Sequence, residues 1–207
     1  LEVFCKTLGI DSPIVFGQSF GGMVAMHYAA RYPKSVAKLI LSSTAAQFRL
    51  DETKKMMRKL GGDYAAEVAY QFFSKPSQAA YDTYGKVCLP LYSNPNAPAA
   101  GNFRNRAIER PEVALHFFSY EMARMDMRSE IASITCPTLV IGGTIDPVTP
   151  PICSQVIADA IGKNACLKLF EACGHGPHRD DPDGAEHVMR SFLSINCLLY
   201  TSPSPRD

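Results

Sequence analysis

The sequence predicts an α/β fold in which a parallel sheet is flanked by helices and carries a helical insertion. Short apolar runs alternate with segments of helical spacing at both ends of the chain, which is the pattern of strand–helix–strand units. Between these two parts, residues 45–130 are polar and helical in pattern, and no strand pattern occurs among them. A Gly-x-Ser-x-Gly motif, residues 17–21, stands between the first expected strand and the helix after it.

The composition is that of an ordinary globular domain. The chain has 207 residues, 46% of them hydrophobic and 20% charged, so one domain with a sizeable core is expected. The formal net charge of +1 gives no signature of binding to nucleic acid or to an anionic membrane, and no apolar run is long enough to cross a bilayer. We therefore expect a cytoplasmic protein with a small-molecule or short-peptide substrate, and neither a nucleic-acid nor a membrane partner.

The seven cysteines are scattered along the chain, and none of them forms a Cys-x-x-Cys pair. No group of histidines has the spacing of metal ligands. We expect reduced, mostly buried thiols, and neither a metal nor a cofactor.

The beginning of the chain predicts a short helix followed by a strand–helix–strand unit. Residues 1–8 have apolar side chains at helical spacing, and Gly9 follows them as a helix-ending signal. The apolar run 13–16 predicts a buried strand, residues 20–32 a helix, and residues 36–42 the next strand. This order implies parallel strands, because the helix carries the chain back to the end of the sheet where it started.

The middle of the chain predicts helices that lie over the carboxyl ends of the strands, where α/β sheets bind ligands. A loop rich in Pro, Asn and Ala at residues 93–101 interrupts this segment. The expected helices are 51–60, 64–73, 77–87, 102–108 and 112–127.

The strand–helix alternation resumes after residue 136. A buried strand leads into a loop that holds Asp146, and the next strand leads into a loop that holds His175. The expected elements are strand 138–141, helix 150–161, strand 166–170 and helix 183–193.

The Gly-x-Ser-x-Gly motif predicts a sharp turn from strand to helix with Ser19 at its tip. We expect Gly17 and Gly21 to relieve crowding at the turn, and Gly22 to let the helix pack close to the sheet. The turn exposes the Ser19 hydroxyl at a helix N-terminus, where the backbone N–H of Phe20 can stabilise a developing oxyanion. The alternative is an ordinary tight turn with a buried serine.

A serine nucleophile needs an adjacent base, and the base needs an orienting carboxylate. Asp146 and His175 each follow a predicted strand, so both side chains are expected at the sheet edge that carries Ser19. For Asp146 the alternative is a turn-forming role before a proline. For His175 the rival is His178, which we expect instead to cap the following helix or to face solvent. Asp180, Asp181 and Asp183 are expected to cap and charge that helix.

With the order Ser, Asp, His after these strands, the chain resembles an α/β-hydrolase-fold enzyme over roughly residues 1–193. The resemblance implies a hydrolase core at 1–44 and 131–195 and a helical cap at 45–130. It implies an acyl-enzyme mechanism in which Ser19 attacks, His175 shuttles protons and Asp146 orients His175. The family takes its second oxyanion donor from a glycine-rich loop after an early strand, so we expect the chain to be an N-terminally incomplete, partial α/β-hydrolase fold.

Part of the middle segment is similar to the prolyl aminopeptidase group of this family. The similarity lies in residues 88–92 and in Tyr120-Glu121 ahead of 125–127. Enzymes of that group hold the free amine of the substrate with carboxylates of the cap, so Glu121 is a candidate anchor, with a solvated glutamate as the alternative. Gln18 and Phe20 flank the serine where that group has Gly-Gly-Ser-Trp-Gly, and Gln18 is a second candidate substrate contact.

The hypothesis is a serine hydrolase acting on a small acyl substrate, with N-terminal prolyl peptides as one candidate. Hydrolysis of an ester, a lactone or a carbon–carbon bond stays open, and so does a non-catalytic binding protein of the same fold. Residues 196–207 resemble the in-frame translation of a sequencing adapter, with a disordered natural tail as the alternative. We expect this segment to take no part in the fold.

Overall fold

A computed structural model describes residues 1–97, 108 and 110–194 of the chain. Its centre is a sheet of four strands in the order β1-β2-β3-β4, and all neighbouring strands are parallel. The parallel sheet predicted from the sequence is therefore confirmed. The strands are β1 (Ile14–Gln18), β2 (Lys38–Ser42), β3 (Thr138–Gly143) and β4 (Ala165–Phe170). The tail at 196–207, Cys197 and the expected helix 102–108 except Ile108 lie outside the described residues.

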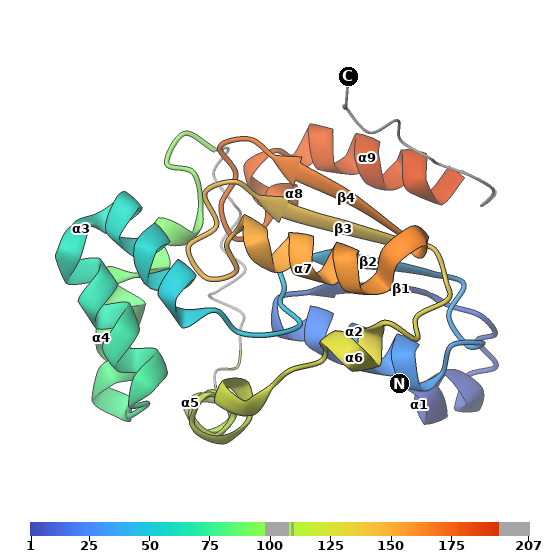
Figure 1. The fold of residues 1–207 in the computed structure, drawn as a ribbon, viewed down its shortest axis with the longest axis horizontal. Helices are drawn as coiled ribbons and strands as arrows, with labels where there is room; N and C mark the ends of the chain where they lie inside the picture. The colour runs from blue at the N-terminus through green and yellow to red at the C-terminus, as the bar shows by residue number, and fades with distance from the viewer. Residues whose placement is uncertain (98–107, 109, 195–207) are drawn as a thin grey trace.

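Helices cover the two faces of the sheet unequally (Figure 1). One face packs against α2 (Phe20–Arg31), α6 (Arg128–Ile131) and α7 (Pro151–Ile161), which contact strand residues such as Leu39 and Val140. The opposite face packs against α9 (Pro182–Ser194), which contacts Ile40, Leu139 and Ile141. Alternate residues of β2 and β3 thus enter two different cores, and for this reason the central strands are apolar throughout. The N-terminal helix α1 (Glu2–Thr7) is joined to α2 by a hydrogen bond that the Tyr28 hydroxyl donates to Glu2.

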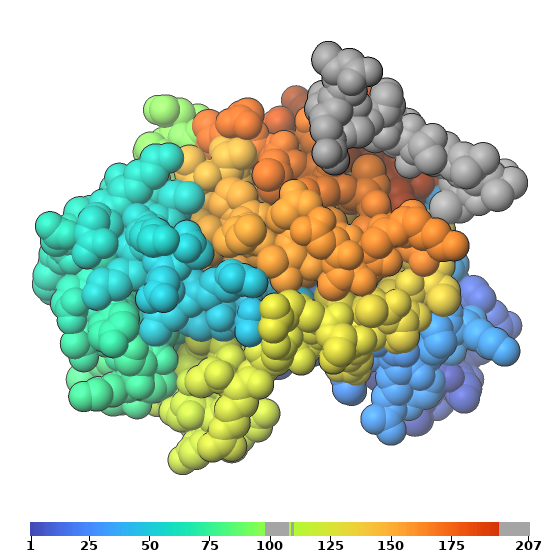
Figure 2. Space-filling view, viewed as in Figure 1, coloured from blue at the N-terminus to red at the C-terminus, as the bar shows by residue number. Residues whose placement is uncertain are grey.

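The described residues between 50 and 124, here called the helical region, gather at one end of the molecule (Figure 2). They have an aromatic core of their own, with Phe72, Phe73 and Tyr84 at its centre. Tyr84 and Phe73 pack around Phe72 at ring-centroid distances of 4.6 and 5.0 Å. The elements are α3 (Leu50–Ser74), α4 (Gln78–Val87), η1 (Leu89–Tyr92), α5 (Pro111–His116), η3 (Phe117–Glu121) and η4 (Met122–Arg124).

The expected helices 51–60 and 64–73 are both present as the two parts of α3, which meet at a kink where Gly62 has non-helical backbone angles. Gly62 has φ 77° and ψ −174°, a conformation that only glycine adopts without strain. The neighbouring Gly61 has no room for a Cβ, because Leu91 and Ala65 side-chain atoms lie 2.6 and 2.7 Å from that position. The kink thus lets α3 bend where η1 packs against it.

The expected helix 112–127 is confirmed as far as Arg124 and is wrong at its last residues. Phe117 and Met122 keep helical backbone angles, while the hydrogen bonds change to those of a π-helix in η3 and of a 3₁₀-helix in η4; the chain is extended at Met125. Asp126 pairs with Gln47 in an isolated β-bridge, and the N–H of Met127 donates to Ala46. These contacts with a distant segment override the local helical pattern. Four short elements have no counterpart in the sequence analysis: α6, η1, α8 (Pro177–Asp180) and η5 (Gly162–Asn164).

The six described cysteines are free, and five of them are buried, which confirms the expectation of mostly buried thiols. Cys166 on β4 is the exposed one among these six. Within the described ranges, no helix combines the length and the apolar character that crossing a bilayer requires.

Candidate active site

The turn between β1 and α2 places Ser19 in a strained backbone conformation. Ser19 has φ 52° and ψ −122°, a region that L-residues rarely adopt. Two contacts hold it there: the N–H of Ser19 donates to the carbonyl of Ser42, the last residue of β2, at 3.0 Å, and the Thr44 hydroxyl donates to the carbonyl of Ser19 at 2.7 Å. Phe20 is the first residue of α2, so its N–H has no acceptor within the helix.

Two of the three glycines of the turn are required by close contacts. A Cβ at Gly17 would lie 2.5 Å from the carbonyl oxygen of Gly21, and a Cβ at Gly22 would lie 2.5 Å from the Cβ of Thr44. The predictions for Gly17 and Gly22 are therefore confirmed. The prediction for Gly21 is wrong, because no atom lies within 4 Å of the position that its Cβ would take.

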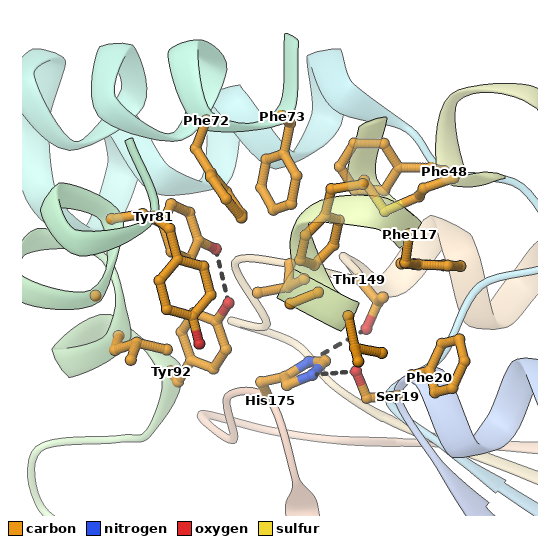
Figure 3. A pocket seen from close by; sticks show the side chains of 18 of the residues that line it. Ser19, Phe20, Phe48, Phe72, Phe73, Tyr81, Tyr92, Phe117, Thr149 and His175 are labelled. Atoms are coloured by element: carbon orange, nitrogen blue, oxygen red, sulfur yellow. Dashed lines mark hydrogen bonds between the residues drawn. The ribbon is translucent and has the colours of Figure 1, made fainter. Parts of the chain in front are cut away.

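The structure brings Ser19, His175 and Asp146 into one hydrogen-bonded chain. Nε2 of His175 lies 3.0 Å from Oγ of Ser19, as Figure 3 shows, and Nδ1 lies 2.9 Å from Oδ2 of Asp146. Asp146 is completely buried and His175 is 5% exposed, so solvent hardly competes for these hydrogen bonds. A hydroxyl, an imidazole and a carboxylate in this order can pass the hydroxyl proton to Nε2, which makes the serine oxygen a nucleophile.

Asp146 both forms a turn and contacts His175, the two alternatives that the sequence left open. Its Oδ1 accepts hydrogen bonds from the N–H groups of Val148 and Thr149, both at 2.9 Å, which is the geometry of a turn-forming aspartate. Its Oδ2 accepts from the Thr149 hydroxyl at 2.8 Å and faces His175. Burial raises the pKa of the Asp146 carboxyl, but the charge and hydrogen bond of His175 and the two N–H groups outweigh it, so the pKa is lowered overall. The carboxylate is thus kept ionised.

The main chain of His175 is clamped by three neighbours. Its N–H donates to the carbonyl of Tyr92 at 2.6 Å. Its carbonyl accepts from the side-chain Nε2 of Gln18 at 3.2 Å and from the guanidinium of Arg179. Gly174 comes so close to η1 that a Cβ there would lie 2.2 Å from the carbonyl oxygen of Tyr92. The loop that carries the imidazole is therefore fixed by β1, α8 and η1 together.

The other polar residues of this loop have roles that differ from the expected ones. His178 neither caps α9 nor faces solvent; it is half-buried in α8, with its ring edge-on to Phe16. Burial, and then the charge of Arg179, lower the pKa of His178. Asp180 accepts hydrogen bonds from the N–H groups of Gly174 and Asn94 instead of capping a helix. Asp181 does cap α9, through the N–H of Gly184 at 3.0 Å.

A cavity of about 910 Å³ opens above Ser19 and His175. The helical region supplies most of its wall, and Figure 3 shows Phe72, Phe73 and Tyr81 directed into it. On the side of Ser19, the rings of Phe20 and Phe117 meet edge to face at 4.9 Å. Apart from three tyrosines, the polar and charged residues of the described lining are Ser19, Asp82, Lys86, Arg110, Thr149 and His175.

Neither of the two expected substrate contacts is among the described residues that line the cavity. The amide of Gln18 is directed at the His175 carbonyl, so Gln18 braces the loop. Glu121 is exposed at the end of η3. Both assignments stay predictions from the sequence, without support from the described lining of the cavity.

The sequence analysis missed Tyr92, Arg179 and Thr149. The first two act through long-range backbone contacts that leave no local pattern. Thr149 could have been found, because a hydroxyl residue three positions after a turn-forming aspartate is a turn signal. Within the described ranges, no group of three or more His, Cys, Asp or Glu side chains could hold a metal ion.

The sequence matches a known protein family and several characterised proteins. A family described as alpha/beta hydrolase fold matches residues 1–182. Proline iminopeptidase PfmaB of Pestalotiopsis fici is 30% identical over 187 residues, which are 87% of this chain and 66% of that protein. A pimeloyl-[acyl-carrier protein] methyl ester esterase of Neisseria meningitidis serogroup B is 26% identical and covers 89% of this chain and 70% of its own length. The chain thus spans about two thirds of the length of these relatives.

Solved structures with the same arrangement include the proline iminopeptidase of Mycobacterium smegmatis. The TM-score is 0.69 at 21% identity, and the match covers 93% of this chain and 68% of the other. An alpha/beta fold family hydrolase from Bacillus anthracis gives a TM-score of 0.67 at 19% identity, over 93% and 71% of the two chains. At these identities the likeness concerns the fold alone.

Proposed function

We propose that this chain, which belongs to the alpha/beta hydrolase fold family, is a serine hydrolase with Ser19 as its nucleophile. His175 is the general base and Asp146 orients it. The observation that carries the proposal is the unbroken chain of contacts, 3.0 Å from Oγ of Ser19 to Nε2 and 2.9 Å from Nδ1 to Oδ2 of Asp146. The strained backbone of Ser19 supports it as well, because such strain is typical of functional sites.

The proposed reaction has two halves, linked by an acyl-enzyme. Oγ of Ser19 attacks the carbonyl carbon of the substrate while Nε2 of His175 takes the hydroxyl proton. The resulting oxyanion accepts a hydrogen bond from the N–H of Phe20, at the positive end of α2. His175 then gives the proton to the leaving group, and water hydrolyses the acyl-enzyme by the same steps in reverse order.

The substrate class that the cavity supports best is an ester with an apolar group next to the scissile bond. The walls carry aromatic rings from α3, α4 and η3, which bind apolar or aromatic groups by burial of surface. The three charged side chains among the lining residues, Asp82, Lys86 and Arg110, are all exposed, so the charge lies away from the interior of the cavity.

Hydrolysis of N-terminal prolyl peptides is the second candidate. It is supported by the relatives named proline iminopeptidases, among them one from Lactobacillus delbrueckii subsp. lactis at 30% identity over 212 residues. An aminopeptidase needs an acceptor for the substrate ammonium group. Asp82 is a carboxylate at the cavity, so it replaces Glu121 as the candidate acceptor in this alternative. We further propose that residues 45–130 act as a cap that closes the site from above.

The test combines a covalent probe with a substrate panel. A fluorophosphonate probe should label the wild-type chain and leave Ser19→Ala unlabelled, and labelling that survives in Ser19→Ala would refute the assignment of the nucleophile. p-Nitrophenyl acetate, butyrate and octanoate are then compared with proline p-nitroanilide. Faster turnover of the longer esters supports the ester class, whereas turnover confined to the anilide favours the aminopeptidase. Tight binding of esters without labelling or turnover would indicate a non-catalytic binding protein.

A further inference from the structure

We propose that Thr149 is a positioning residue of this site, because its hydroxyl holds the Asp146 carboxylate in the orientation that faces His175. The inference rests on the proposed function and adds a fourth residue to its machinery. Thr149 lies in the loop between β3 and α7, is 3% exposed and lines the cavity beside His175 (Figure 3).

Thr149 donates a hydrogen bond to each oxygen of the Asp146 carboxylate. Its backbone N–H donates to Oδ1 at 2.9 Å, and its hydroxyl donates to Oδ2 at 2.8 Å. With the N–H of Val148 on Oδ1, three donors besides the imidazole hold the carboxylate. Rotation of Asp146 about its terminal bond would break the contacts at both oxygens at once. The carboxylate is therefore fixed before any substrate binds.

The same hydroxyl helps to place the imidazole proton. The Thr149 oxygen lies 3.4 Å from Nδ1 of His175, and Asp146 lies 2.9 Å from the same nitrogen. An ionised carboxylate only accepts hydrogen bonds, and a hydroxyl that has given its one proton to Oδ2 offers only lone pairs to other neighbours. Both groups that face Nδ1 thus favour a proton on it, which leaves the lone pair of neutral His175 on Nε2, opposite Ser19.

Other charged or titratable groups surround Asp146 and His175, and a substitution at position 149 leaves these groups unchanged. Tyr84 of α4 and Cys153 of α7 interact electrostatically with Asp146. His178 interacts with His175, the Arg179 guanidinium donates to the His175 carbonyl, and Asp180 accepts from Gly174. Because none of these contacts involves the Thr149 hydroxyl, a change at Thr149 isolates its own contribution.

The experiment measures the rate of fluorophosphonate labelling of the full chain between pH 5 and 9. Thr149→Val removes the hydroxyl at nearly constant volume, and Thr149→Ser keeps it. Thr138→Val is the matched control, since Thr138 is a buried threonine of β3 whose hydroxyl donates to Cys136, away from the site. Ser19→Ala measures the background labelling that does not depend on Ser19. Thermal unfolding of each variant is followed in parallel, and Thr149→Ala replaces Thr149→Val if the latter does not fold.

We expect Thr149→Val to be labelled about tenfold more slowly at neutral pH, with the loss largest at the acid end of the range. The direction follows because a carboxylate with one donor fewer presents more uncompensated negative charge to Nδ1. The labelling rate of Thr149→Ser should stay within about twofold of wild type at every pH, as should that of Thr138→Val.

Two results would overturn the role of Thr149 alone: a wild-type rate and pH profile in Thr149→Val, or an equal loss in Thr149→Ser, which would indicate that only the methyl group matters. A wild-type chain that is not labelled at Ser19 would instead refute the proposed function, and the role of Thr149 with it.

Discussion

The two sides of the cavity are built in different ways. The reactive side, formed by the loops around Ser19, Asp146 and His175, is held by hydrogen bonds of fixed geometry and by backbone contacts that only glycine permits. The opposite side, formed by the helical region, is held by the packing of rings such as Phe72 and Phe117. Packing between rings tolerates the exchange of one apolar group for another. Loss of a hydrogen-bond donor, or a Cβ added where there is no room, is not compensated by the neighbouring residues. We therefore expect substitutions on the reactive side to act on turnover and those on the helical side to act on substrate affinity.

The largest effect is expected from Asp146→Asn. An amide keeps the shape of the side chain but favours the wrong imidazole tautomer, so kcat/KM for p-nitrophenyl butyrate should fall by about 10⁴-fold with the fold intact. Circular dichroism verifies the fold. Asp159→Asn is the matched control, because Asp159 is an exposed aspartate of α7 that is bonded to Gln155. A loss of less than tenfold in Asp146→Asn would remove this carboxylate from the proposed mechanism.

The second-largest effect is a difference in stability between substitutions at two glycines of the Gly-x-Ser-x-Gly motif. Gly17→Ala places a Cβ against the backbone of Gly21 and Gly22, at 2.5 and 2.7 Å, and should lower the free energy of unfolding by about 3 kcal/mol. Gly21→Ala enters open space, so its stability should stay within about 1 kcal/mol of wild type. Urea denaturation measures both. Equal destabilisation by the two substitutions would contradict the contacts described for this turn.

A substitution on the helical side should change affinity more than turnover. Phe117→Leu removes the ring that packs against Phe20 beside Ser19, so KM for p-nitrophenyl octanoate should rise about five-fold with kcat within about twofold. Phe192→Leu on α9, which packs against the far face of the sheet, serves as the control and should leave KM unchanged. If kcat fell with KM constant, the distinction between the two sides would not hold.

The smallest effect is expected from Glu121→Gln. Glu121 is exposed and lies outside the described cavity lining, so KM for proline p-nitroanilide and for the ester should stay within about twofold. Asp82→Asn is the informative comparison, since that carboxylate does line the cavity. A tenfold rise in KM for the anilide alone, in Glu121→Gln, would restore the amine-anchor role inferred from the resemblance.

The reactive side was predictable from the sequence because its signals are local. A glycine-bounded serine between a strand and a helix, and polar residues directly after two later strands, fix which side chains meet at one sheet edge. The structure brings Ser19, Asp146 and His175 together as this reasoning predicts. The positions of Gln18 and Asp180 were not predictable, because their partners, His175 and Asn94, are distant in sequence.

The helical side was predictable in type but not in detail. Helical spacing identified α3 and α4 correctly, since their apolar faces enter one aromatic core. The extended residues near Asp126 depend on contacts with residues 46 and 47, which no local pattern reports. The kink at Gly62 occurs at a glycine within the gap left between the two expected helices, so the local signal for a bend was present there.

The two outer strands of the described sheet, β1 and β4, differ in the charge of their side chains. β4 presents Lys168, and a charged side chain on an outer strand discourages unwanted pairing. β1 presents Ile14 and Phe16, which are 53% and 48% exposed, and Val15 and Gly17 add no charge. Among the described strands, β1 pairs with β2 alone, and its uncharged side chains lack the protection that Lys168 gives to β4.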